Sequence, residues 1–181
     1  EIVGFRDGRA LLMGLAPLSG IAPGALVLPD RHDGSIGVGD ALLGRVIDAL
    51  GRPLDGLPPP ACPVRWPASP PPLAPQARSR VTQMLATGVR ALDALLSFGV
   101  GQRIAVMAGT GVGKSVLLGQ IARWAQADVV VMALIGERSR EISDFIDGEL
   151  AGPARERIVT IAVPAADAML CRVRGAQRAF A

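Results

Sequence analysis

The residues with the clearest chemical potential lie in a glycine-rich stretch, residues 108–115, which reads AGTGVGKS. Its glycines allow successive backbone N–H groups to turn inward around a phosphate. The lysine ammonium can reach the β- and γ-phosphates of a nucleotide, and the serine hydroxyl can ligate Mg²⁺. The stretch therefore predicts a nucleotide site. The residues predicted to bind the nucleotide are Gly109, Thr110, Gly111, Val112, Gly113, Lys114, Ser115 and Val116, with Ser115 also as the metal ligand.

Lys114 is the only lysine among the 19 Lys and Arg residues of the chain. A compact ammonium fits a nest of amides that a planar guanidinium does not, because the two cations differ in size and donor geometry. This favours a phosphate site over a glycine-rich turn that ends in Lys-Ser by chance. The first position of the motif is Ala108 where its strict form has glycine, a change that costs little if this residue does not need a positive φ.

Glu137 and Arg138 form a second candidate pair, because they follow the apolar run 129–135. Ligands in open parallel sheets bind at the carboxyl ends of strands, so we expect both residues beside the phosphate loop. A carboxylate there can orient or deprotonate the water that attacks a γ-phosphate, and an arginine can stabilise charge on that phosphate. The alternative is a solvated helix start in which glutamate favours the dipole and pairs with arginine. Lys114, Glu137 and Arg138 are the predicted catalytic residues.

The alternation of apolar runs predicts the elements that position these residues. A strand over 103–107 enters the glycine-rich stretch, and a helix over 114–126 leaves it. The later elements are strand 128–135, helix 139–147, strand 157–163 and a helix from about residue 166. Such alternation predicts an α/β fold in which helices cover both faces of a parallel sheet.

The first half of the chain reads differently. The predicted strands are 1–5, 9–13 and 25–28, with a turn around Asp7 and Gly8. A proline-rich connector from 58 to 75 resists helix and sheet, so it should lie extended over the surface or form a disordered linker. Thr87 is a candidate N-cap for a helix over 90–96. The chain starts inside a predicted strand and ends inside a predicted helix, so we expect a fragment of a longer protein.

Composition argues against several classes of function. The net charge of +3 is spread along the chain and aromatic residues make up 3%, which does not support nucleic-acid binding. Cys62 and Cys171 lie far apart and His32 is the only histidine, so we predict reduced thiols in a cytoplasmic protein and no zinc site. The longest apolar run, 129–135, is too short to span a bilayer.

With these residues in hand, the sequence resembles the catalytic-subunit family of rotary ATP synthases, and most closely its protein-export branch, the flagellar and type III secretion ATPases. The resemblance covers essentially all 181 residues. It rests on four segments in order: LGRVIDALGRPLDG at 43–56, TGVRALD at 87–93, AGTGVGKSVLLG at 108–119, and the run from Ala127 to Arg138. The form of the phosphate loop looks like flagellar and secretion members, whereas synthase β subunits usually have Gly-Gly first and Thr last.

The resemblance implies a division of the chain and a role for each site residue. Residues 1–30 would be the end of a small N-terminal β-barrel, and residues 31–181 an incomplete RecA-like nucleotide-binding domain. The implied roles are phosphate-loop lysine for Lys114, Mg²⁺ hydroxyl for Ser115, catalytic carboxylate for Glu137 and adjacent arginine for Arg138. Non-catalytic sister subunits typically have Gln where Glu137 stands, which favours a hydrolysing site. The second Mg²⁺-site carboxylate, arginine finger and adenine pocket of the family have no counterpart here.

The function implied by the resemblance is Mg²⁺-dependent hydrolysis of ATP to energise protein export by a flagellar or type III secretion apparatus. Implied partners are further copies in a homo-hexamer, stalk and regulator proteins, and the inner membrane, which the protein would meet peripherally from the cytoplasm. The alternatives are the catalytic subunit of a proton-translocating synthase, and a truncated nucleotide-binding or assembly subunit without activity. We expect the 181-residue chain alone to be inactive.

Overall fold

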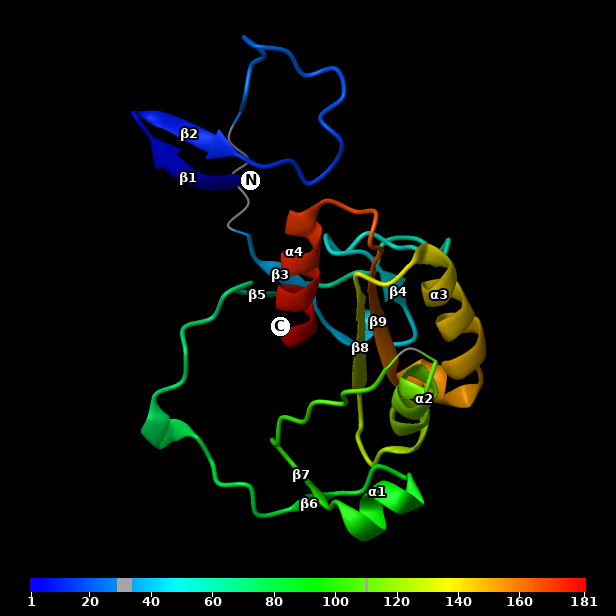
Figure 1. Ribbon diagram of the computed structural model, residues 1–181. Coiled ribbons are helices and arrows are strands. Elements are labelled where there is room, and N and C mark those ends of the chain that lie inside the picture. Colours follow the sequence, from blue (N-terminus) through cyan, green and yellow to red (C-terminus); the bar gives the residue numbers. More distant parts are fainter. Residues whose placement is uncertain (29–33, 110) are drawn as a thin grey trace.

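A parallel sheet of three strands, in the order β4–β9–β8, forms the centre of the computed structural model, which describes residues 1–28, 34–109 and 111–181 (Figure 1). The strands are β4 (Val46–Ile47), β8 (Val130–Ile135) and β9 (Ile158–Val163). β8 and β9 pair in register along their whole length, and β4 pairs with the middle of β9. The parallel sheet predicted from the alternating pattern is therefore confirmed.

The middle strand, β9, is buried at all six positions. Its sequence, IVTIAV, is almost continuously apolar, as expected for a strand covered on both faces. Helix α4 (Met169–Phe180) covers one face (Figure 1). The other face packs against α2 (Lys114–Trp124), α3 (Ser139–Asp144) and the π-helical turn η3 (Phe145–Glu149). Helices on both faces were predicted, and this is confirmed.

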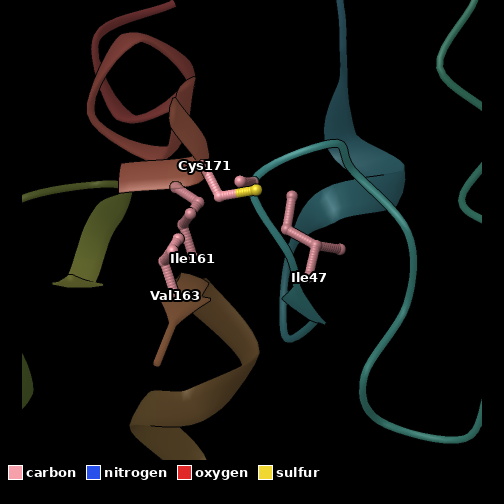
Figure 2. Packing of buried hydrophobic residues seen from close by; sticks show 5 residues of the cluster. Ile47, Ile161, Val163 and Cys171 are labelled. Carbon is pink, nitrogen blue, oxygen red and sulfur yellow. The ribbon is translucent and has the colours of Figure 1, made fainter. Parts of the chain in front are cut away.

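Alternate side chains of β9 fill two separate halves of the core. On the α4 face, Ile161 and Val163 pack with Ile47 of β4 and Cys171 of α4 (Figure 2). On the opposite face, buried side chains of α2, α3 and η3 meet the sheet; they are Ala122, Ile142, Phe145 and Ile146. Each fully buried Ile, Val or Phe contributes roughly 1.5–3 kcal/mol of transfer free energy, so these contacts fix how the helices lie on the sheet.

Residues 103–107, predicted as the strand before the glycine-rich stretch, form no strand, so this prediction is wrong. Ile104 is 44% exposed and Met107 is 90% exposed. Strands require a neighbour that accepts and donates the ladder hydrogen bonds. Among the described residues, β8 pairs on one edge only, with β9, and no strand pairs with residues 103–107. Apolar sequence alone therefore does not produce a strand here.

The other predicted elements of this half occur with shifted ends. The helix predicted over 114–126 ends at Trp124, and the helix predicted from about 166 begins at Met169. The helix predicted over 139–147 is α-helical only to Asp144 and continues as the π-helical turn to Glu149. A 3₁₀ turn, η4 (Pro153–Arg157), leads directly into β9.

The N-terminal segment contains one hairpin, formed by β1 (Ile2–Arg6) and β2 (Arg9–Leu12). Asp7 and Gly8 have φ angles of 49° and 72°, as a two-residue turn with two left-handed positions requires. The strand predicted over 25–28 does not form. The hairpin lies at one end of the molecule (Figure 1), and an ion pair of 2.7 Å joins Glu1 to Arg174 of α4.

The proline-rich connector is not entirely without regular structure, contrary to the prediction. Within it, β5 (Val64–Trp66) pairs antiparallel with β3 (Ile36–Val38). Outside β5 and a single 3₁₀ turn, η2 (Pro75–Ala77), residues 58–83 are irregular and mostly exposed. The remaining short elements are η1 (Asp40–Leu42), β6 (Met84–Leu85), α1 (Arg90–Leu95) and β7 (Phe98–Gly99).

The prediction that Thr87 is the N-cap of α1 is wrong, because the N-cap is Val89, and Thr87 instead holds the turn that precedes the helix. The Thr87 hydroxyl accepts a hydrogen bond from the Val89 N–H at 3.2 Å and donates to Asp93 at 2.7 Å. The Asp93 carboxylate also accepts the N–H groups of Thr87 and Gly88. These hydrogen bonds, led by the one from the Thr87 backbone, lower the pKa of Asp93.

Cys62 and Cys171 are both free thiols, as predicted, and burial raises the pKa of Cys171. His32 lies outside the described residues. Within the described ranges, no helix is both long and apolar enough to cross a membrane.

Arg45 and Asp55 form a largely buried ion pair beside β4. The Arg45 Nε–Asp55 Oδ2 distance is 2.7 Å, and 14% and 6% of the two side chains are exposed. The Arg45 guanidinium holds the pKa of the Asp55 carboxyl well below its usual range, with further hydrogen bonds from the N–H groups of Val46 and Leu57. The pair fastens the segment after β4 against that strand.

Replacing Asp55 with asparagine should lower the free energy of unfolding by about 2 kcal/mol at pH 7, because charge-assisted hydrogen bonds are lost. The folded-state pKa of Asp55 is depressed, so its contribution is complete above the unfolded-state pKa of about 4 and is lost as pH falls below it. In urea unfolding measured from pH 7 to pH 2.5, the difference in the free energy of unfolding between wild type and Asp55→Asn should therefore shrink below about pH 4. The exposed Asp147→Asn is the control; an equal loss there, or a gap that widens in acid, would contradict this account.

Candidate functional site

The glycine-rich stretch leads directly into α2, whose first two residues are Lys114 and Ser115. Gly113, at the N-cap, has a φ of 93°, and Gly111 has a φ of 77°. Both angles are in the left-handed region that side chains disfavour, which explains the glycines at these two positions. Ala108 is not among the residues with positive φ, so alanine is tolerated there as expected. The result is a loop whose amides and helix N-terminus favour an anion.

A cleft of about 820 Å³ opens between this loop and the end of β8. Its volume is within the usual range for small-molecule sites, roughly 300–1,000 Å³. The loop side is lined by Ala108, Gly109, Gly111, Gly113, Lys114, Ser115 and Val116. The facing side includes Glu137, which follows β8, and carboxylates of α3 and η3, namely Glu141, Asp144 and Glu149. The structure thus brings Lys114, Ser115 and Glu137 to one cleft, from segments more than twenty residues apart.

Three of the predicted residues are not seen in the wall of this cleft. Arg138 does not line it; its side chain is 85% exposed and lies 3.4 Å from Glu141. Val112 is 66% exposed and is also outside the lining. Thr110 lies outside the described residues. Arg138 is thus solvated at the start of α3, but it pairs with Glu141 and not with Glu137, the pairing that the alternative from sequence supposed.

Arg157, which sequence reasoning missed, sets the orientation of α2. Its guanidinium donates hydrogen bonds to backbone carbonyls at the C-terminal end of that helix and just after it. The acceptors are Ala122 at 3.4 Å, Arg123 at 2.9 Å, Ala125 at 3.1 Å, and Ala127. A cation there also opposes the negative end of the helix dipole. Since Arg157 precedes β9, it ties the end of α2 to the start of the sheet, and Lys114 therefore lies toward the carboxyl ends of the strands.

The contact between α2 and η3 is unusually close at Gly119. A Cβ atom at this position would lie 2.6 Å from the Glu149 Cβ, closer than real side chains approach. Glu149 in turn lies 3.1 Å from Arg123 of α2, so this carboxylate of the cleft lining is paired. A glycine inside a helical pattern was the available sequence signal for this close approach.

Glu137 is positioned mainly by its backbone. Gly136, with a φ of 80°, turns the chain out of β8 and donates to the Val163 carbonyl at 2.8 Å. The Glu137 carbonyl accepts the N–H of Ala165 at 2.8 Å. No described residue makes a hydrogen bond or ion pair with the Glu137 side chain, which is exposed to the cleft. Its carboxylate is therefore available to a ligand.

The model of the ATP synthase alpha/beta family, nucleotide-binding domain, matches residues 88–181. The chain is 48% identical to a protein named "Flagellum-specific ATP synthase" from Salmonella typhimurium, over 97% of this chain and 40% of that protein. This chain belongs to the ATP synthase alpha/beta family. It is also 42% identical, over 96% of its length and 40% of the relative, to a protein named "SPI-2 type 3 secretion system ATPase" from the same species.

Solved structures of the family agree with the fold. The chain matches the assembled ATPase EscN in complex with its central stalk EscO, from the type III secretion system of enteropathogenic E. coli. The match has a TM-score of 0.90 and 37% identity, and covers 99% of this chain and 44% of that one. The chain thus spans about 40% of the length of the curated relatives it matches. The match shows that this chain has the RecA-like nucleotide-binding fold of EscN.

The residues present fit a nucleotide with a divalent cation. The positive-φ glycines leave space at the amides, with no atom within 4 Å of a Cβ built at Gly111 or Gly113. Lys114 supplies a cation and Ser115 a hydroxyl in the same cleft wall. These are the donor types that bind phosphate oxygens and complete the shell of a hard cation.

Lys114→Ala should weaken the binding of Mg·ATP by roughly 10- to 150-fold, since it removes the cation of the loop and a charge-assisted hydrogen bond of roughly 1.5–3 kcal/mol. Calorimetric titration of the complete nucleotide-binding domain measures the change. Arg103→Ala, which removes an exposed cation outside the cleft lining, is the matched control and should bind like wild type. Equal affinity of Lys114→Ala and wild type would remove the basis of this site.

Proposed function

We propose that the parent protein, meaning the full-length protein that contains this chain, hydrolyses ATP with Mg²⁺ to energise protein export by a flagellar or type III secretion apparatus. The observation that carries the proposal is the cleft in which Lys114 and Ser115 face Glu137. The names of the relatives, a flagellum-specific ATP synthase and a type 3 secretion system ATPase, support the export role.

In the proposed reaction, the phosphate loop binds and Glu137 acts on water. The amides around Gly111 and Gly113, together with Lys114, hold the β- and γ-phosphates at the N-terminus of α2. Ser115 would hold Mg²⁺, which when bound neutralises phosphate charge. Glu137 orients the attacking water and accepts its proton as the oxygen of that water bonds to the γ-phosphorus, while the bond from the γ-phosphorus to the bridging oxygen breaks and ADP leaves.

Arg138 has the proposed role of stabilising negative charge on the γ-phosphate. In the structure its side chain pairs with Glu141, so the role requires this pair to open. Since 85% of the Arg138 side chain and 52% of Glu141 are exposed, the pair is screened by solvent and opening costs little. Arg138 is thus proposed to join the site when a nucleotide is present.

Assembly and location are also proposals. The related EscN is described as an assembled ATPase with a central stalk. We infer that the parent protein likewise forms a homo-hexamer, contacts stalk and regulator proteins, and lies at the cytoplasmic side of the inner membrane as a peripheral component of the export apparatus. Residues 1–30 would belong to an N-terminal β-barrel and residues 31–181 to the RecA-like domain.

Two other functions have distinct signatures. The catalytic subunit of a proton-translocating synthase would share the phosphate loop and Glu137, and would be separated from an export ATPase by its partner subunits. A truncated nucleotide-binding or assembly subunit would lack an arginine finger and a second Mg²⁺-site carboxylate. The DNA on either side of the coding region for this chain distinguishes these possibilities.

Glu137→Gln in the parent protein should retain nucleotide binding and lose hydrolysis by roughly 10²–10⁴-fold, because the amide cannot accept the proton of water. Phosphate release measures the rate and calorimetry the affinity. Asp144→Asn, which changes another carboxylate that lines the same cleft and pairs with Arg140, is the control and should hydrolyse within a few-fold of wild type. Hydrolysis at the wild-type rate by Glu137→Gln would assign Glu137 to a solvated helix start.

The 181-residue chain on its own should show little or no ATP turnover. Phosphoryl transfer needs positive charge and positioning groups from several sides, and an arginine finger alone contributes on the order of 10³-fold or more. The exposed outer edge of β8 should also promote aggregation. Assays on monomeric fractions from size exclusion test both points. Steady turnover by the monomer that Lys114→Ala abolishes would show that the groups described here suffice.

A further inference from the structure

The turn that joins β9 to α4 is fastened at Ala165 from both sides. The Ala165 N–H donates to the Glu137 carbonyl at 2.8 Å. The Ala165 carbonyl accepts a hydrogen bond from Arg172 Nη2 at 2.6 Å. Arg172 lies in the first turn of α4, which packs against β8 and β9. A continuous path of two hydrogen bonds therefore runs from α4 through one residue to the backbone of Glu137.

One N–H group of the Arg172 side chain does not contribute to stability. Its Nε is buried and has no hydrogen-bond partner among the described residues. Since a buried unpaired N–H is unfavourable, a guanidinium at this position is poorly explained as a packing element. Its contact with Ala165 leads, through the Ala165 N–H, to Glu137, which lines the cleft.

We propose that Arg172 is a positioning residue that holds Glu137 through the Ala165 backbone. This inference rests on the proposed ATP hydrolysis and adds a residue to it. The Glu137 carboxylate has no described side-chain partner, and Gly136 before it lacks a side chain that could restrict the backbone. The hydrogen bond from the Ala165 N–H to the Glu137 carbonyl thus restrains the backbone of Glu137 directly. When Arg172 is lost, the 164–168 turn loosens, and the carboxylate moves relative to the phosphates that the separate α2 loop holds.

This arrangement predicts a specific kinetic pattern. Nucleotide affinity depends on Lys114 and the loop amides, which do not contact Arg172, so it should not change. The rate of hydrolysis should fall by roughly 10–100-fold, the effect of a displacement of about 1 Å in a catalytic group. A general loss of folding would instead lower affinity and rate together.

The test compares Arg172→Met, Arg172→Lys and Arg174→Met in the parent protein. Methionine keeps the length of the side chain without its donors, whereas lysine can still donate to the Ala165 carbonyl. Arg174 is the matched control, since it lies on the same helix and bonds Glu1 and Gln177 instead. We expect reduced kcat with unchanged ATP affinity in Arg172→Met, partial recovery in Arg172→Lys, and wild-type kinetics in Arg174→Met.

A double variant separates positioning from a general structural effect. If Arg172 acts through Glu137, adding Arg172→Met to Glu137→Gln should not lower the residual rate further, because the group it positions is already lost. A multiplicative loss in the double variant, or wild-type kcat in Arg172→Met, would overturn the inference while leaving the proposed function intact.

Amide hydrogen exchange supplies a readout that does not depend on hydrolysis. In the wild-type parent protein the Ala165 N–H should be protected, and Arg172→Met should expose it while the protection of β8 and β9 persists. Unchanged protection of the Ala165 N–H in Arg172→Met would refute the role of Arg172, whether or not the parent protein hydrolyses ATP. Absence of ATP hydrolysis by the wild-type parent protein would instead count against the proposed function.

Discussion

Burial of β9 on both faces is the constraint on which the other contacts depend. All six of its residues are buried, so side chains on one face require α4 and those on the other require α2, α3 and η3. Such a strand cannot lie at a surface without exposing one apolar face to water. The residues before and after β9 fix further segments: Arg157 holds the end of α2, and the turn containing Ala165 holds Glu137, two residues after β8.

The chemistry of the site follows from the direction of these elements. Parallel strands place their carboxyl ends at one edge of the sheet, and α2, anchored at its C-terminal end, presents its N-terminus at that edge. Anion-binding amides and Lys114 therefore meet the carboxylate of Glu137 across a cleft. In the proposed reaction neither half suffices, because the loop would bind phosphate without activating water, and a carboxylate alone would repel a polyphosphate. Membership of the ATP synthase alpha/beta family is consistent with this division of roles.

The sequence predicted the parts of the fold that depend on local pattern and failed where distant contacts decide. The phosphate loop, α2 and the strands β8 and β9 were predictable because glycine spacing and apolar runs are local signals. The strand over 103–107 was not formed, since a strand depends on neighbours that the described sheet does not provide. Arg157 and Arg172 were not predictable, because each acts on backbone carbonyls that any residue type supplies. The sequence predicted Arg138 beside the loop only because it follows β8 in the chain. In the structure its exposed side chain pairs with Glu141.

The most direct measurement of the central claim is an experimental structure of the parent protein with Mg²⁺ and a non-hydrolysable ATP analogue. The account predicts the triphosphate at the N-terminus of α2, within the amides of residues 109–115, with Lys114 on the β- and γ-phosphates. It also predicts that the Glu137 carboxylate faces the γ-phosphate with Ala165 still bonded behind it. Phosphates bound elsewhere, or a bound nucleotide with Glu137 turned into solvent, would contradict the account.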